Sequence, residues 1–166
     1  IGVGLLGLGT VGVGVAKILE TPNDRHPLVK DLELIQVAVR DLERPRSIKL
    51  SKDLLTTSPE EVIDNPHVQV VVEVLGGIEP ARSLIMRSIE AGKSVVTANK
   101  AVIARHCEEI AAAATAAGVY VLIEAAVGGG IPIIEPLKQS LGGNRIKKVS
   151  GIINGTTNYI LSRMSQ

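Results

Sequence analysis

Val3-Gly-Leu-Leu-Gly-Leu-Gly-Thr-Val-Gly12 is the stretch from which the fold of this chain is predicted. Gly7, Gly9 and Gly12 have the spacing G-x-G-x-x-G, between an apolar segment typical of a strand and a segment typical of a helix. Gly7 permits a tight turn, Gly9 lets a pyrophosphate approach the backbone, and Gly12 lets the helix pack closely against the strand. The free N–H groups at such a helix start bind anions. We therefore expect a dinucleotide-binding turn; a tight turn in another α/β protein is the alternative.

The composition favours a buried parallel sheet. Hydrophobic residues make up 45% of the 166 residues, and in the absence of Phe and Trp the core must consist of Val, Ile, Leu and Ala, as in sheets covered by helices on both faces. The net charge of +1 gives no general attraction to nucleic acid or to an anionic membrane. Cys107 is the only cysteine, which fits a reducing cytoplasm.

Strand and helix patterns alternate through residues 1–131. After the first strand and the helix over residues 11–20, the patterns predict strands over 32–39, 68–75, 94–97 and 119–124, and helices from Ser58, from Pro80 to about Ala91 and from Val102 to Ala117. This alternation predicts the α/β class, with a Rossmann-type, doubly wound parallel sheet. We expect residues 1–131 to form an NAD(P)-binding domain.

The sequence changes in character after Glu124, beginning with a small, glycine-rich stretch over 125–132. The residues that follow predict a helix over 133–141, a turn over 142–144, a strand over 146–153, a turn over 154–158 and a helix over 159–164. We consider residues 132–166 together. Because so short a segment cannot form an independent domain, we expect it to be the beginning of an α+β substrate domain that is truncated here.

Arg40 follows the second strand, where such folds contact the adenosine ribose. An acid there binds the ribose hydroxyls and favours NAD, whereas an arginine accommodates the 2′-phosphate of NADP. Arg44 and Arg46 follow closely, so we expect NADP to be preferred. Asp41 leaves NAD possible, and Arg40 as a solvated loop residue is the alternative.

Two further features are ambiguous when read from the residues alone. Gly76-Gly77 follows a predicted strand and so falls at the carboxyl edge of the sheet, where ligands bind; an ordinary turn explains it equally well. Lys100 opens a helix, where its charge opposes the helix dipole. Beside a nicotinamide it could stabilise an alkoxide on the substrate, but most lysines are simply exposed.

Five blocks in order carry a resemblance to one family. They are Gly-Leu-Gly-Thr-Val-Gly at 7–12, Glu-Val-Leu-Gly-Gly at 73–77, Val-Val-Thr-Ala-Asn-Lys at 95–100, Glu-Ala-Ala-Val-Gly-Gly-Gly-Ile-Pro at 124–132 and Gly-Ile-Ile-Asn-Gly-Thr-Thr-Asn-Tyr-Ile at 151–160. Together they resemble homoserine dehydrogenase, nearly end to end. The resemblance implies a cytoplasmic enzyme that interconverts L-homoserine and L-aspartate 4-semialdehyde with NAD(P), in threonine, methionine and isoleucine biosynthesis.

The resemblance also implies residue roles. Lys100 would lie between the nicotinamide and the substrate, as the catalytic lysine. The cofactor would be held by the three glycines, Thr10, Val11, Arg40, Leu75, Gly76 and Lys100. A monovalent cation, usually sodium, would be held by Glu124, Val127, Gly129 and Ile131, a set that offers one carboxylate and backbone carbonyls as oxygen ligands.

The family's substrate-binding acids and second catalytic lysine come later than Gln166. We therefore expect this chain to bind cofactor but to turn over slowly or not at all, because hydride transfer needs the substrate held in place. The complete enzyme is expected to be a homodimer or larger. A different NAD(P)-dependent semialdehyde reductase and a non-catalytic dinucleotide-binding module are the alternatives.

Overall fold

A parallel sheet of six strands forms the centre of the structure, a computed structural model that describes residues 1–23, 25–151 and 155–165. The strand order is β3-β2-β1-β4-β5-β6, and every pairing within it is parallel. The strands are β1 (Gly2–Leu6), β2 (Glu33–Ala38), β3 (Leu55–Thr56), β4 (Val70–Glu73), β5 (Ser94–Thr97) and β6 (Val121–Leu122). β1 is buried along its whole length, as the apolar segment before the glycines predicts.

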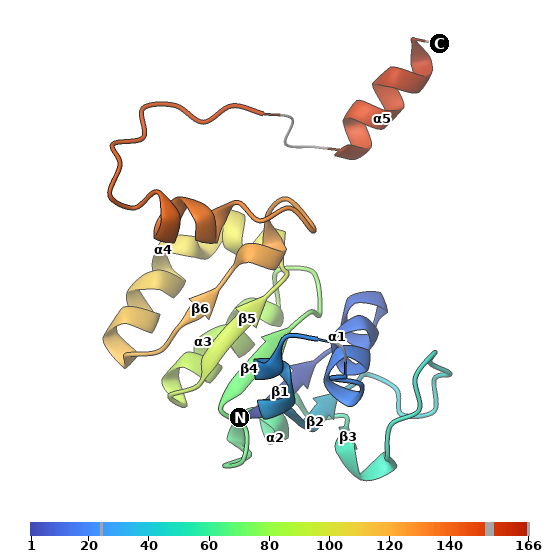
Figure 1. Cartoon of the computed structure of the whole chain (residues 1–166). Helices are drawn as coiled ribbons and strands as arrows, with labels where there is room; N and C mark the ends of the chain where they lie inside the picture. The colour runs from blue at the N-terminus through green and yellow to red at the C-terminus, as the bar shows by residue number, and fades with distance from the viewer. Residues whose placement is uncertain (24, 152–154, 166) are drawn as a thin grey trace.

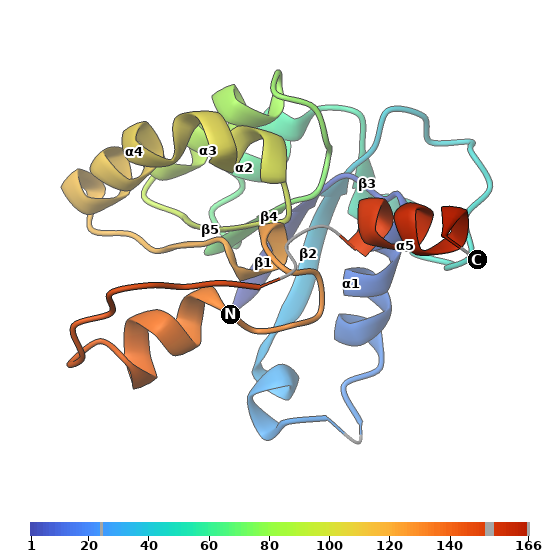
Figure 2. The ribbon, with the colours of Figure 1, turned by 90° about the horizontal axis from the view of Figure 1, so that it is seen from above.

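Helices cover both faces of this sheet (Figures 1 and 2). The main helices are α1 (Thr10–Glu20), α2 (Pro59–Asp64), α3 (Ala81–Glu90), α4 (Lys100–Ala117) and α5 (Gly155–Met164). Short helical turns occupy Pro27–Asp31, Lys52–Leu54, Glu124–Ala126 and Pro136–Ser140. Figure 2 shows α1 on one side of the sheet and α2, α3 and α4 on the other. The α/β, Rossmann-type, doubly wound fold is confirmed.

The order of the strands reverses between β1 and β4, which lie side by side in the middle of the sheet. From β1 the chain builds outward through β2 to β3, and then crosses back to start the other half at β4. Leu6 and Glu73, the last residues of β1 and β4, are register partners. The loops after these two strands therefore diverge at a topological switch point, which is where open α/β sheets bind ligands.

Local signals in the sequence fix several element ends. Ser58 caps α2 by accepting the N–H of Glu61 at 3.3 Å, and Pro59 is the first residue of the helix. The Glu61 carboxylate does not complete a capping box, because it accepts the hydroxyl of Thr56 at 2.5 Å instead. Gly118 ends α4 in the left-handed conformation, with φ of 68°.

Three predicted strands differ from the structure. β4 ends at Glu73 rather than at Leu75, because the N–H of Leu75 bonds to the side chain of Glu73 instead of a neighbouring strand. β6 is only two residues long and pairs with two residues of β5, while Glu124 has already entered a helical turn. Residues 146–151 form no strand, because no other described segment pairs with them.

The end of the chain is also different from prediction. α5 begins at Gly155, so the described part of the predicted turn over 154–158 is instead the first turn of this helix; glycine, threonine and asparagine are all tolerated at a helix start. Ile152, Ile153 and Asn154 lie outside the described residues. In Figure 1, α5 lies apart from the sheet, and its apolar residues Tyr159, Ile160, Leu161 and Met164 are exposed. The division into domains 1–131 and 132–166 stays a prediction.

Candidate cofactor-binding site

A pocket of about 280 Å³ lies at the switch point. Its walls come from the turn after β1, the loop after β2 and the loop after β4, together with residues at the starts of α2 and α3. Four of the residues predicted to bind a cofactor line it: Gly7, Gly9, Arg40 and, from the β4 side, Leu75. The fold thus brings together predicted cofactor residues as far apart in sequence as Gly7 and Leu75.

The three glycines of the turn have the geometry that their spacing predicts. Gly7 has φ of 104°, and its N–H donates to the carbonyl of Ala38 at 3.0 Å. A Cβ atom on Gly12 would lie 2.1 Å from the carbonyl oxygen of Gly7, so only glycine lets α1 start this close to β1. A Cβ atom on Gly9 would meet nothing within 4 Å, which leaves the backbone there open to a ligand.

The start of α1 is open to an anion. Gly9 is the N-cap residue and has no side chain to accept a hydrogen bond, and the first turn carries no acidic residue. Thr10 and Val11, in that first turn, are exposed. Free N–H groups and the positive end of the helix dipole therefore face solvent beside the pocket, which suits a pyrophosphate.

Three arginines lie along the loop that follows β2, and all of them line the pocket. Arg46 stabilises the loop itself by donating to the carbonyls of Asp41 at 2.5 Å and Arg44 at 2.9 Å. Within the described part of the chain, Arg40 and Arg44 form no hydrogen bond or ion pair through their guanidinium groups and are exposed. Two unpaired guanidinium groups are therefore available to a phosphate.

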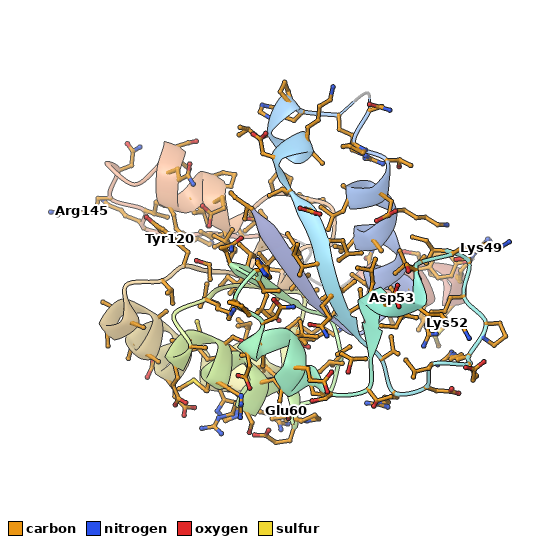
Figure 3. All side chains as sticks on the ribbon, turned by 90° about the horizontal axis from the view of Figure 1, so that it is seen from below. Lys49, Lys52, Asp53, Glu60, Tyr120 and Arg145 are labelled. Atoms are coloured by element: carbon orange, nitrogen blue, oxygen red, sulfur yellow. The ribbon has the colours of Figure 1, made fainter. Side chains whose placement is uncertain are left out.

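Lys49 and Lys52 belong to a later part of the same connection and do not line the pocket. Figure 3 shows both on the connection between β2 and β3, where Lys52 lies 3.9 Å from the Glu43 carboxylate. The positive charge that faces the pocket therefore comes from the arginines.

The loop after β4 is joined to the start of α4. Gly76 and Gly77 have φ of 78° and 75°, so the loop needs glycine at both positions. Asn99 donates to the carbonyl of Gly77 at 2.7 Å and also caps α4 by accepting the N–H of Val102 at 3.2 Å. Lys100 is the first residue of α4 and is exposed. Lys100, the predicted catalytic lysine, thus directly follows Asn99, whose side chain is hydrogen-bonded to the predicted cofactor loop.

Sequence reasoning missed the importance of Glu73. This residue is fully buried at the end of β4 and hydrogen-bonds to Leu75, Thr97 and Asn99. The available signal was a carboxylate in an otherwise apolar strand, but its partners on β5 and α4 could not be identified before the fold was known.

The predicted cation ligands lie in the turn after β6. The Glu124 carboxylate accepts N–H groups from Ile133, from Ile134 at 3.1 Å and from Glu135 at 2.6 Å, and these bonds, that of Ile133 first, lower the pKa of Glu124. No described residue donates a hydrogen bond to the backbone carbonyls of the other three predicted ligands, Val127, Gly129 and Ile131. These three carbonyls are thus unbonded, whereas the carboxylate of Glu124 is already partly used.

A second depression, of about 500 Å³, lies at the opposite edge of the sheet. Lys93 lines it and is largely buried, with Nζ donating to the carbonyls of Asn65 at 2.7 Å and Val68 at 2.6 Å. Burial lowers the pKa of Lys93. These contacts hold the loop before β4, far from the glycine turn, so we assign Lys93 a structural role.

Among the described residues, no three His, Cys, Asp or Glu side chains are placed to bind a metal, and no helix is long and apolar enough to cross a membrane.

Family models and solved structures agree with this geometry. Residues 7–124 match the homoserine dehydrogenase NAD-binding domain, and residues 132–166 match the family described as homoserine dehydrogenase. The chain belongs to the homoserine dehydrogenase family. It is similar to the homoserine dehydrogenase of Synechocystis sp., with 60% identity over 98% of this chain and 38% of that protein. The chain therefore spans well under half the length of this relative.

Two solved homoserine dehydrogenases share the fold along almost the whole chain. The enzyme from Thiobacillus denitrificans is 49% identical, with a TM-score of 0.87 over 99% of this chain and 38% of that one. A hyperthermophilic archaeal homoserine dehydrogenase, solved in complex with NADPH, is 25% identical, with a TM-score of 0.81 over 99% of this chain and 56% of that one. The resemblance seen in the five sequence blocks is confirmed at the level of the family and the fold.

Proposed function

We propose that this chain is the cofactor-binding part of an NADP-preferring homoserine dehydrogenase, which interconverts L-aspartate 4-semialdehyde and L-homoserine. The observation that carries the proposal is the meeting of the glycine turn and two unpaired arginines in one pocket at the switch point. The NADPH complex of the archaeal relative supports the choice of cofactor. The reaction would serve threonine, methionine and isoleucine biosynthesis in the cytoplasm, as the resemblance implies.

The adenosine half of NADP would occupy the pocket. Gly7, Gly9 and Gly12 let the pyrophosphate reach the start of α1, where the N–H groups of Thr10 and Val11 would bind it. Arg40 and Arg44 would bind the 2′-phosphate through planar guanidinium groups. Asp41 keeps its carboxylate on the N–H of Glu43, at 2.9 Å, so it is less available to the ribose hydroxyls that NAD would offer. NAD is therefore proposed as the weaker ligand.

The other half of the cofactor would lie along the loop after β4. Leu75 and Gly76 would contact the ribose and nicotinamide, and NADP supplies the hydride chemistry when it is bound. Lys100 would donate a hydrogen bond to the reacting oxygen of the substrate, which stabilises the negative charge that develops there during reduction of the aldehyde. In the reverse direction, the same contact would orient the hydroxyl-bearing carbon of L-homoserine.

We also propose a monovalent cation such as sodium at the turn after β6. The unbonded carbonyls of Val127, Gly129 and Ile131 would supply most of its ligands, and one carboxylate oxygen of Glu124 would add charge. This cation would stabilise the turn between the proposed domains 1–131 and 132–166. The remaining substrate-binding groups and the contacts of a homodimer are proposed to lie in the part of the enzyme that this chain does not span.

The test uses the complete enzyme that contains this chain. Lys100→Met is expected to lower kcat for L-homoserine oxidation by about 10²-fold or more, while the Kd for NADPH stays within about threefold, because Lys100 acts on the substrate oxygen. Arg105→Met is the matched control, because it removes an exposed positive charge from the same helix. Unchanged kcat in the Lys100 variant, or an equal loss in the control, would contradict the proposed role.

A further inference from the structure

Glu73 is a fully buried acid whose hydrogen bonds join two loops of the proposed site. Its Oε1 accepts the N–H of Leu75 at 2.8 Å and a side-chain N–H of Asn99 at 3.5 Å, and its Oε2 accepts the hydroxyl of Thr97 at 2.6 Å. Within residues 1–23, 25–151 and 155–165, no lysine, arginine or histidine forms an ion pair with it. The acid is thus held by three neutral donors.

Stability alone does not explain an acid at this position. A buried carboxylate without a cationic partner is less favourable than a well-packed apolar side chain of similar size. Glu73 lies on the same face of β4 as the fully buried Val71, which packs in a cluster with Leu84. An apolar residue at position 73 would continue that packing, so the importance of the acid must lie in the groups that it holds.

These groups are the first half of the loop after β4 and the first turn of α4. Glu73 fixes Leu75 near the start of the loop. The hydroxyl of Thr97, which donates to Glu73, accepts the N–H of Asn99 at 3.0 Å, and Asn99 in turn holds Gly77 in the middle of the loop. The Glu73 carboxylate therefore sets the position of the loop relative to Lys100, which directly follows Asn99.

We infer that Glu73 is a positioning residue that preorganises the nicotinamide half of the cofactor site. It acts through the loop of Leu75, Gly76 and Gly77 and through the start of α4. The inference rests on the proposed function, since that proposal puts the nicotinamide against this loop. Glu73 itself is 0% exposed, so it would act on the cofactor only through the groups that it holds.

The test compares two ligands on the chain. NADPH occupies both halves of the site, whereas adenosine 2′,5′-bisphosphate occupies only the pocket with the glycine turn and Arg40. Glu73→Leu is expected to reduce the preference for NADPH over the bisphosphate by about tenfold, because hydrogen bonds that order the loop are lost. The Kd of the bisphosphate should stay within about twofold. Glu73→Gln keeps an acceptor for Leu75 and is expected to recover most of the preference.

Val71→Ala is the matched control. It removes buried volume two residues earlier on the same face of β4 and lowers stability without touching the loop, so the ratio of the two Kd values should not change. If Glu73→Leu does not fold, Thr97→Val removes one hydrogen bond to the carboxylate and should shift the ratio in the same direction. An unchanged ratio, or an equal loss of both ligands in a folded variant, would overturn the inference.

A second measurement separates this inference from the proposed function. Amide hydrogen exchange on the ligand-free chain should be faster at Leu75 and Val102 in Glu73→Leu than in Val71→Ala. Binding of neither ligand by the unchanged chain would contradict the proposed function, and the exchange result would still decide the role of Glu73. Equal exchange rates at these two amides in both variants would overturn the inference that Glu73 positions the loop.

Discussion

Arg40 is the residue on which the proposed preference for NADP over NAD depends. It lines the pocket after β2 with its guanidinium group unpaired among the described residues, and Arg44 adds a second such group. A guanidinium group binds phosphate through two parallel hydrogen bonds, whereas it gains little from an uncharged ribose hydroxyl. A substitution of Arg40 alone should therefore remove the preference for NADP over NAD.

Arg40→Asp is expected to raise the Kd for NADPH by about tenfold or more, because a charged hydrogen bond is replaced by repulsion of the 2′-phosphate. The Kd for NADH should fall or stay the same, since the new carboxylate can accept from the ribose hydroxyls. Titrations followed by cofactor fluorescence measure both constants. Lys49→Asp makes the same change of charge outside the pocket (Figure 3) and should leave the ratio unaltered; an unaltered ratio in the Arg40 variant would contradict its role.

Gly12 is the residue at which the turn tolerates no side chain. Gly12→Ala would place a Cβ atom 2.1 Å from the Gly7 carbonyl oxygen, so we expect a loss of about 1–3 kcal/mol of stability together with weaker NADPH binding. Gly14→Ala is the control, because position 14 lies in the same helix with open space around it and should gain about 0.5–1 kcal/mol. Denaturant unfolding measures both, and equal effects of the two changes would show that Gly12 is only an ordinary helix residue.

At the scale of the element, Glu124 holds the turn after β6 against the segment that begins at Ile133. Its pKa is lowered in the folded protein, because its carboxylate accepts backbone N–H groups, that of Ile133 first. A group with a lowered folded pKa adds stability above its unfolded pKa, about 4.3 for glutamate, and this contribution is lost as the pH falls through the folded value. The turn should therefore be ordered at neutral pH and loosen in acid.

Amide protection at Ile134 and Glu135 is expected to decrease as the pH is lowered below about 4. Glu124→Gln should weaken this protection already at neutral pH and remove its dependence on acid. Glu108→Gln, at an exposed position on α4, serves as the control. It should change neither the amide protection at neutral pH nor its dependence on pH. Hydrogen exchange with mass spectrometry measures the effect, and constant protection through the acid range in the unchanged chain would be inconsistent with the hydrogen bonds described.

Elements with local signals were predictable from the sequence. The strand, glycine turn and helix at residues 2–20, the cap at Ser58 and the stop at Gly118 each depend on residues a few positions apart. The network of Glu73 was not predictable, because two of its three partners are 24 and 26 positions away. The strand expected over 146–153 was wrong in its described part, since apolar alternation does not supply the neighbouring strand that a ladder requires.

At the scale of the whole molecule, the strand order creates the site. Crossing from β3 back to β4 places the loops after β1 and β4 side by side, so the glycine turn, the arginines and the loop of Gly76 surround one switch point. The alternation of strands and helices predicted this arrangement, and the five sequence blocks predicted the family.

The measurement that tests this account most directly is a titration of the chain with NADPH, and separately with NADH, followed by the fluorescence of the cofactor. The chain has no Trp to add to the signal. The account predicts saturable NADPH binding, with NADH at least about tenfold weaker because it lacks the 2′-phosphate that Arg40 is proposed to bind. Equal affinity for both would contradict the role of the arginines, and saturable binding of neither would contradict the cofactor site itself.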